Sequence, residues 1–282
     1  PVLPGQYADP DIDYFDGKFW IYPTTDGFSG WSGNYFHAFS STDLVNWTDE
    51  GVILDVNKDH QPTTDGDENT AISPWSVGSA WAPTIEKKNG KYYFYYCAKL
   101  PNGQSAIGVA DNPAGPFKAA DQPLVTRTME GVTVGQAIDP SIFTDPNTGK
   151  SYILYGNGSP AIAELNDDMV SIKAGTVKKL NGLNDFRESV VVAYRDGKYH
   201  WTWSCDELPE LPCEVRRLRF HRRHHHLQGC AAAEGFLQEP ARCRAPVRRA
   251  CDRRGRQRPL AHGLPSPLHA ARRVHLRPWL PP

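Results

Sequence analysis

Three carboxylic acids stand at the start of three of the four similar stretches in this chain. They are Asp9, Asp139 and Glu188. Carboxylates that converge on one pocket raise one another's pKa, so such a group is unfavourable unless it binds a cation or moves protons. A general acid needs such a raised pKa, whereas a general base needs to stay ionised. The residue types therefore predict acid–base chemistry, provided that the fold brings the three stretches together.

The four stretches are predicted to be β-hairpins. Each opens with a short polar-to-apolar run, turns at a Gly-Lys pair and leaves through an aromatic-rich run, and the copies begin near Ala8, Ala82, Asp139 and Glu188. The turns are Asp-Gly, Asn-Gly or Thr-Gly, whose glycine can adopt positive φ. Copies recur at roughly 50 to 75 residues, which leaves room for two more strands per unit and is typical of propellers or solenoids. A β-sandwich with repetitive strands is the alternative architecture.

The propeller interpretation explains how distant acids would meet. In a propeller the first strand of each blade lies against the central channel, so residues at the heads of the repeats face one another. Asp9, Asp139 and Glu188 are expected to do so. Asp11, two positions further along its strand, and Asp145, before a Pro-Asn turn, are expected to be structural.

Charge divides the chain into two regions. Residues 1–206 hold 12 Lys, 3 Arg and 26 acids, so 15 − 26 = −11, whereas residues 207–282 hold 16 Arg and 6 acids, so 16 − 6 = +10. The second region also contains no Ile, Thr, Tyr, Asn, Lys or Met. No apolar run reaches the length of a membrane helix. We predict a catalytic β-propeller domain over residues 1–206 and an anomalous tail over 207–282.

Several motifs of residues 1–206 resemble the family 43 glycoside hydrolases. They are Ala8-Asp9-Pro10-Asp11, Ile138-Asp139-Pro140-Ser141 and Arg187-Glu188-Ser189, together with Ser41 to Trp47 and Trp81-Ala82-Pro83. The resemblance implies an all-β, five-bladed β-propeller that hydrolyses arabinose- and xylose-containing polysaccharides with inversion. It also implies that Asp9 is the general base, that Glu188 is the general acid, and that Asp139 tunes the pKa of the acid and orients it.

Five further residues are expected to contact substrate. Trp31, Trp75 and Trp81 are candidates to stack on sugar rings, because an aromatic face suits the C–H side of a sugar. Filling between blades is the alternative role for each of these aromatic residues. Phe186 and Arg187, next to the proposed acid, are expected to contact substrate hydroxyls.

The tail has the composition of GC-rich coding sequence translated out of frame. Read one base later, the codons for four stretches can spell sequences that resemble late segments of the family, including a Gly-His element; these stretches are Glu210–Leu218, Leu227–Glu234, Arg244–Arg249 and Leu260–Ser266. We therefore hypothesise a single-nucleotide frameshift between about Cys205 and Leu208. It would remove the fifth blade from this chain, expose strand edges and lower stability.

Two other interpretations of the tail are weaker. His224, His225 and His226 with Cys213 and Cys230 match no common zinc-site spacing. Its arginine runs lack the interleaved aromatic residues and the recognised modules of nucleic-acid-binding proteins. We assign no metal ligand and expect no nucleic-acid or membrane partner.

The functional expectation is an exo-acting α-L-arabinofuranosidase that cleaves side chains of arabinan or arabinoxylan, plant cell-wall polysaccharides. A β-xylosidase on xylo-oligosaccharides is the nearest enzymatic alternative, and a catalytically impaired carbohydrate-binding propeller is the alternative from another class. No cofactor is expected to be required, although the resemblance implies a structural calcium ion at the centre of an intact family member. An extracellular, secreted location is expected from the substrate class alone.

Overall fold

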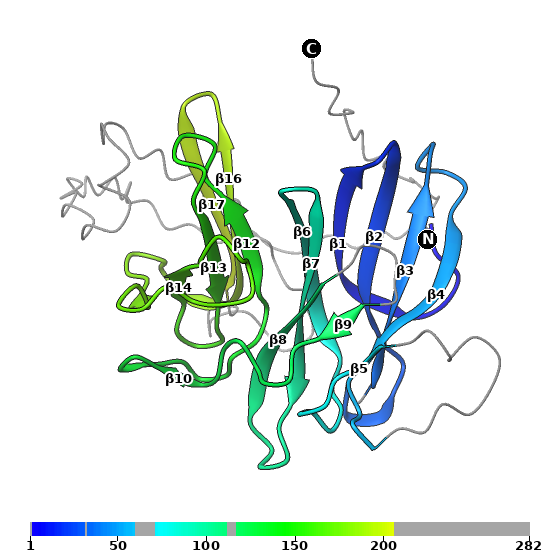
Figure 1. The fold of residues 1–282 in the computed structure, drawn as a ribbon, viewed down its shortest axis with the longest axis horizontal. Helices are drawn as coiled ribbons and strands as arrows, with labels where there is room; N and C mark the ends of the chain where they lie inside the picture. The colour runs from blue at the N-terminus through cyan, green and yellow to red at the C-terminus, as the bar shows by residue number, and fades with distance from the viewer. Residues whose placement is uncertain (1, 32, 60–70, 112–116, 206–282) are drawn as a thin grey trace, which may run out of the picture. The chain divides into compact units, whose positions relative to one another are not determined.

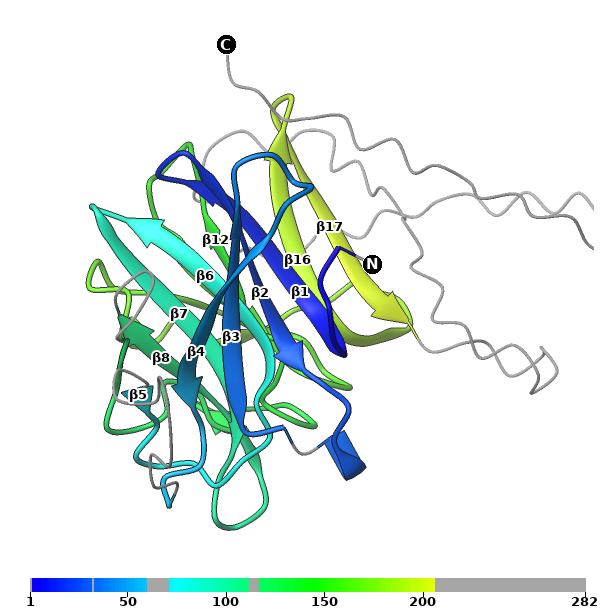
Figure 2. The ribbon, with the colours of Figure 1, turned by 90° about the vertical axis from the view of Figure 1, so that its right-hand side faces the viewer.

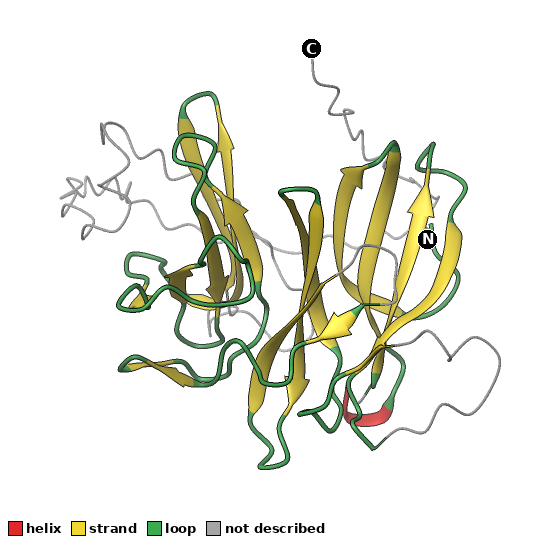
Figure 3. Cartoon of the chain, in the orientation of Figure 1, coloured by secondary structure: helices red, strands yellow, loops and turns green. Residues whose placement is uncertain are grey.

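The computed structural model describes residues 2–31, 33–59, 71–111 and 117–205, which form an all-β fold with one short 3-10 helix at Ser29–Trp31 (Figure 3). All of them fall in the first of two units, Pro1–Pro240; the second unit, Ala241–Pro282, lies outside the described residues. The tail and its proposed frameshift therefore stay predictions.

The described strands form successive antiparallel meanders, as the repeats predict (Figure 1). We call the four main sheets blades one to four. Blade one contains β1 (Tyr7–Phe15), β2 (Lys18–Thr25), β3 (Tyr35–Ser41), β4 (Thr48–Asp55) and β5 (Ala71–Ile72), the last parallel to β4 (Figure 2). Blade two contains β6 (Trp81–Lys88), β7 (Lys91–Lys99), β8 (Ser105–Asp111) and β9 (Lys118–Ala119).

Blade three contains β12 (Ser141–Thr144), β13 (Ser151–Tyr155), β14 (Ala161–Glu164) and β15 (Lys178–Lys179). Blade four is described as the hairpin of β16 (Phe186–Arg195) and β17 (Lys198–Cys205). A small hairpin of β10 (Thr128–Met129) and β11 (Val132–Thr133) lies between blades two and three in the sequence. The described part of the chain thus contains the four predicted repeats, and the presence or loss of a fifth blade stays a prediction.

Three of the four predicted hairpin turns have the expected geometry. Asp16-Gly17, Asn89-Gly90 and Asp196-Gly197 each place two consecutive residues at positive φ, between 51° and 79°. This backbone twist matches that of the flanking strands. The turn of blade three is longer, because Asp145 accepts the backbone N–H of Asn147 and the hydroxyl of Thr148 and so closes a wider loop. This contact confirms the structural role expected for Asp145.

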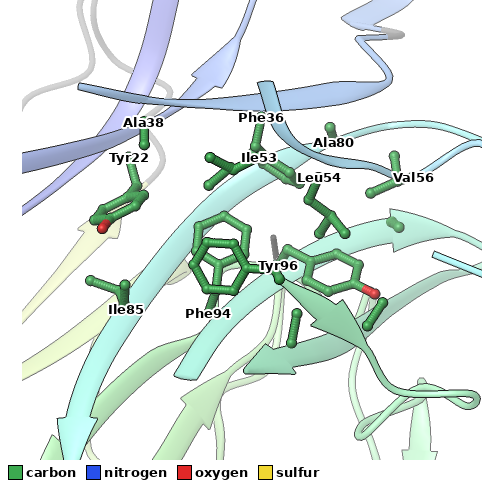
Figure 4. Packing of buried hydrophobic residues seen from close by; sticks show 14 of the residues in the cluster. Tyr22, Phe36, Ala38, Ile53, Leu54, Val56, Ala80, Ile85, Phe94 and Tyr96 are labelled. Atoms are coloured by element: carbon green, nitrogen blue, oxygen red, sulfur yellow. The ribbon is translucent and has the colours of Figure 1, made fainter. Parts of the chain in front are cut away.

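Aromatic residues fill the space between the blades. One buried cluster joins blades one and two, where the rings of Phe36 and Phe94 meet edge to face at 5.3 Å (Figure 4). Two further clusters pack blade two against blade three and blade three against blade four. Rings of this size bury large apolar areas, and edge-to-face pairs add specific geometry. The clusters therefore fix the order and spacing of the inner strands.

Hydrogen bonds between inner strands support this arrangement. Oδ2 of Asp11 on β1 accepts from Thr84 Oγ1 at 2.9 Å and from the backbone N–H of Ile85 at 3.0 Å, both on β6. Oε1 of Glu86 on β6 accepts from Thr144 Oγ1 on β12 at 2.8 Å. Asp11 is therefore a structural residue, as expected, and it ties blade one to blade two.

Candidate active site

The heads of the inner strands share an unusual backbone conformation. Asp9, Ala82 and Asp139 have φ values of 44°, 36° and 54°, and each precedes a proline; in blade four Ser189 has a φ of 58°. Non-glycine residues rarely adopt positive φ, and such strain is concentrated at functional sites. The strand register shifts beside Asp9, Ala82 and Ser189, which marks β-bulges that redirect side chains. Each of the four described blades thus has one such residue at the head of its inner strand, which we call the projecting position.

The three acids do not all use this position. Asp9 and Asp139 occupy it directly, whereas Glu188 lies one residue before its blade-four counterpart, Ser189. Glu188 therefore enters the site from a different backbone position. Because of this offset, Glu188 and the two aspartates have different hydrogen-bond partners.

Asp9 is held by a threonine of the neighbouring strand. Thr24 Oγ1 on β2 donates to Asp9 Oδ2 at 3.0 Å and accepts the backbone N–H of Ala82 at 2.7 Å. One hydroxyl thus joins the projecting positions of blades one and two. The carboxyl group of Asp9 remains exposed to solvent, where it can meet a water molecule.

Asp139 is the most constrained of the three acids. Its Oδ2 accepts from Ser189 Oγ at 2.8 Å, and its backbone N–H donates to Cys97 Sγ at 3.1 Å. Burial raises the pKa of Asp139 to about 7, opposed by the hydrogen bond from Ser189 and assisted by the negative charges of Glu188 and Asp9. These charge effects mean that the three acids interact, as the sequence predicted from their places in the repeat.

Glu188 is held through a single oxygen. Its Oε2 accepts from Asn157 Nδ2 at 2.6 Å, and the same oxygen lies 4.0 Å from Arg187 Nε. The side chain of Glu188 is 30% exposed, so the carboxyl group is open to solvent on one side. The arrangement leaves Oε1 of Glu188 available for proton transfer.

The predicted sugar-stacking tryptophans have different environments. Trp75 is only 7% exposed, and its ring packs against that of Tyr96 at 5.9 Å in the cluster between blades one and two. The expectation that Trp75 stacks on a sugar is therefore wrong, because its ring is buried and stacks on Tyr96. Trp81, next to the projecting Ala82, is partly exposed. Trp31 ends the 3-10 helix, and its side chain lies outside the described part of the chain.

Phe186 and Arg187 lie beside Glu188, as their sequence positions require. Phe186 is partly buried against the cluster of blades three and four. Arg187 is exposed, and its guanidinium group approaches Glu188 as described above. Of the two, Arg187 is the more exposed to solvent.

Four residues that hold the acids were not predicted from the sequence: Thr24, Cys97, Asn157 and Ser189. All four contact acids that lie 15 to 50 residues away in the chain, so no local spacing indicates them. One signal was present, since Gly156-Asn157-Gly158 interrupts blade three with a motif typical of a special backbone turn.

The described residues show no side-chain metal cluster and no membrane-spanning helix. There, no three His, Cys, Asp or Glu side chains are grouped so that they could hold a metal ion. No helix of the described segments has the length and apolar character needed to span a membrane. The calcium ion implied by the resemblance stays a prediction.

Successive antiparallel blades with three interacting carboxyl groups at the heads of their inner strands define a propeller-type protein with an acid–base site. Sequence comparison agrees, because the profile of the glycosyl hydrolases family 43 matches residues 1–222. The chain belongs to this family.

Individual relatives carry several names. The chain is 31% identical over 223 residues, 72% of its length, to a "Beta-D-galactofuranosidase" of Aspergillus niger, of which it covers 58%. It is 34% identical over 169 residues, 55% of its length, to a "Xylosidase/arabinosidase" of Bacteroides ovatus, of which it covers 45%. It is 27% identical over 70% of its length to an "Arabinoxylan arabinofuranohydrolase" of Bacillus subtilis, of which it covers 42%. The chain thus spans about half the length of these relatives.

Solved structures show the same fold. A β-xylosidase/α-arabinofuranosidase from a compost metagenome, solved with xylotriose, aligns with a TM-score of 0.59 and 27% identity over 72% of each chain. An α-L-arabinofuranosidase of Clostridium thermocellum aligns with a TM-score of 0.56 and 28% identity over 71% of this chain and 64% of that one.

Proposed function

We propose that this chain is an inverting, exo-acting α-L-arabinofuranosidase that acts on arabinan or arabinoxylan. The observation that carries the proposal is the hydrogen bond from Ser189, the residue after Glu188, to Asp139, which joins the heads of two acid-bearing strands. The charges of Glu188 and Asp9 also raise the pKa of Asp139. Family membership supports the reaction class. The substrate is a cell-wall polymer, so we also propose that the protein acts outside the cell.

The proposed reaction is a single displacement. Glu188 donates its proton to the glycosidic oxygen, and the bond from this oxygen to the anomeric carbon breaks. Asp9 accepts a proton from a water molecule, whose oxygen forms the new bond on the opposite face of the sugar. Inverting enzymes hold these two carboxyl groups roughly 6.5 to 9.5 Å apart to admit the water. The exposed carboxyl of Asp9 and the partly open carboxyl of Glu188 are compatible with these roles.

Asp139 helps to keep a proton in the site. Because its pKa is raised to about 7, Asp139 retains a proton below that pH. An acid catalyst near neutral pH needs such a retained proton.

The names of the relatives support a furanose as the sugar. Arabinofuranose and galactofuranose both have five-membered rings, and relatives named for each are similar to this chain. Trp81 precedes Ala82, which is linked to Asp9 through Thr24, and Arg187 precedes Glu188. Both are at least partly exposed, and they are proposed to contact that ring and its hydroxyls.

A β-xylosidase is the second candidate. Relatives named for both xylosidase and arabinosidase activity support it as much as they support an arabinofuranosidase. The two activities need the same acids and differ in the pocket around the sugar. A carbohydrate-binding propeller without activity is the remaining alternative. It predicts retained sugar binding with no turnover by the unchanged chain.

The test compares nitrophenyl α-L-arabinofuranoside, β-D-xyloside and β-D-galactofuranoside as substrates of the full chain. We expect the arabinofuranoside to give the highest kcat/KM, and proton NMR of the first product to show an inverted anomeric centre. Asp9→Asn should lower kcat by roughly a hundredfold or more. Retained configuration, or unchanged activity of this variant, would contradict the proposal.

A further inference from the structure

The loop after β13 connects the segments that carry two of the acids. The backbone N–H of Gly156 donates to the carbonyl oxygen of Ile138 at 2.9 Å, and the N–H of Gly158 donates to that of Arg187 at 2.7 Å. Ile138 directly precedes Asp139, and Arg187 directly precedes Glu188. The three-residue loop Gly156–Gly158 therefore holds the backbone of the residue that precedes each of these two acids.

Asn157, at the centre of this loop, has little freedom to move. Its backbone N–H donates to Gln136 O at 3.0 Å, and its carbonyl oxygen accepts from the N–H of Gly135 at 2.9 Å. The residue is 7% exposed, although its side chain is polar. A buried amide needs partners for its hydrogen-bonding groups, and Nδ2 of Asn157 finds one in Oε2 of Glu188 at 2.6 Å.

The glycines around Asn157 permit this close packing. Gly156 has a φ of 120°, and a Cβ atom there would lie 2.3 Å from the carbonyl oxygen of Ser159. A Cβ atom on Gly135 would lie 2.5 Å from the carbonyl oxygen of Asn157. Neither position accepts a side chain without moving the backbone. The loop is thus built to bring Asn157 to a defined place.

We propose that Asn157 is a positioning residue for Glu188, and that the loop Gly156–Gly158 sets the place of the Glu188 carboxyl group relative to Asp139. This inference rests on the proposed function, because it assumes that Glu188 is the general acid. The hydrogen bond from Asn157 and the guanidinium group of Arg187 both lie at Oε2 of Glu188. The transferable proton is therefore carried by Oε1, and the amide of Asn157 turns that oxygen toward the leaving group.

The test exploits the leaving group. Poor leaving groups need protonation by the acid, whereas an activated leaving group such as dinitrophenolate does not. Asn157→Ala in the full chain should lower kcat about tenfold or more on phenyl α-L-arabinofuranoside, and no more than about threefold on the dinitrophenyl substrate, with little change in KM. An equal loss on both substrates overturns the inference, because a general structural defect does not distinguish leaving groups.

A matched control and a second variant keep the test decisive. Asn147, in the hairpin turn of blade three, donates to Tyr199 Oη at 3.1 Å, so Asn147→Ala removes an amide hydrogen bond that involves none of the three site acids. It should not change the leaving-group dependence. Asn157→Asp keeps the shape but places a negative charge beside Glu188, so the alkaline limb of the pH–rate profile should move to higher pH. An unmoved limb overturns the inference even if Asn157→Ala fails to fold.

Glu188→Ala separates failure of the inference from failure of the proposed function. If Glu188 is the acid, this variant must lose far more activity on the phenyl than on the dinitrophenyl substrate. If it shows no such difference, the proposed role of Glu188 is wrong, and the inference about Asn157 is overturned with it. If Glu188→Ala shows the difference and Asn157→Ala does not, only the inference about Asn157 is overturned.

Discussion

Sγ of Cys97 accepts the backbone N–H of Asp139 at a distance of 3.1 Å. Cys97 lies on β7 and is completely buried, and burial, assisted by the charges of Asp139 and Asp9, raises the pKa of its thiol well above the ordinary value. The sulfur is thus a neutral acceptor. It stabilises the strained backbone of Asp139 from inside blade two, which links the core of one blade to the acid of the next.

Replacing Cys97 should affect activity through this hydrogen bond. Cys97→Ala leaves a buried N–H without an acceptor, which costs about 1–3 kcal/mol, so we expect lower thermal stability and lower kcat. Cys97→Ser supplies an oxygen acceptor and should recover most of both. Thermal denaturation and steady-state kinetics measure the two effects, and a serine variant no better than the alanine variant would argue against the hydrogen bond.

Thr24 offers a similar test for Asp9. Thr24→Val keeps the shape but removes the hydroxyl that joins Asp9 to the backbone N–H of Ala82. We expect a loss of about 1–3 kcal/mol in the free energy of unfolding and a lower kcat, because Asp9 loses its orientation. Thr24→Ser, which keeps the hydroxyl, is the control in urea unfolding and in kinetics. Equal behaviour of the two variants would contradict this role.

Ser189→Ala should change the pH dependence of the reaction. The hydrogen bond from Ser189 favours the ionised form of Asp139, so its removal should raise the pKa of Asp139 further above about 7. The limb of the pH–rate profile that reports the acid cluster should then move to higher pH. Ser171, which donates to Asp168 Oδ2 at 2.6 Å on an exposed turn, provides a matched serine-to-alanine control with an unchanged profile.

Asp13 should make stability depend on pH. Burial raises its pKa to about 7, assisted by the charges of Asp11 on the same strand and of Glu86 on β6. The folded state therefore binds a proton that the unfolded state has lost between about pH 4 and pH 7, and the free energy of unfolding falls as the pH rises through this window.

Asp13→Asn removes the charge and should raise Tm at pH 8 much more than at pH 4. Asp121→Asn, at an exposed position, is the control and should change Tm little at either pH. Thermal scans at both values measure the difference. A similar shift of Tm by Asp13→Asn at pH 4 and pH 8 would show that the charge of Asp13 is not responsible.

The hypothesis of a frameshift agrees with exposed apolar residues on the first and last described blades, and resequencing can test it. Ile12 and Tyr14 on β1 are 53% and 60% exposed, and Val191 on β16 is 45% exposed, which is unusual for apolar residues of inner strands. Resequencing codons 200–215 should reveal an inserted or deleted base, and the corrected protein should have a higher Tm and less tendency to aggregate. An unchanged reading frame would refute the account of the tail.

Local patterns predicted much of the fold. The Asp-Gly and Asn-Gly turns lie where the sequence placed them, because turn preference is a property of neighbouring residues. The repeat also predicted which acids would interact, since equivalent positions in successive blades share one environment.

The partners of those acids were beyond such patterns. Thr24 and Asn157 contact the site through chain segments that the sequence separates by tens of residues. Trp75 was misinterpreted for a related reason, because a tryptophan in a loop and one that fills the space between blades look alike until the neighbouring strands are placed. Packing across blades, rather than local spacing, decides these contacts.

Ala82 shares the kinked backbone of Asp9 and Asp139, including the following proline, yet it carries only a methyl group. The backbone conformation therefore does not depend on the carboxylate. Alanine and aspartate codons can differ by one base. A single mutation can therefore add or remove an acid at this position of a repeat without a change of fold. The same backbone position can therefore hold a carboxylate in one repeat and a methyl group in another.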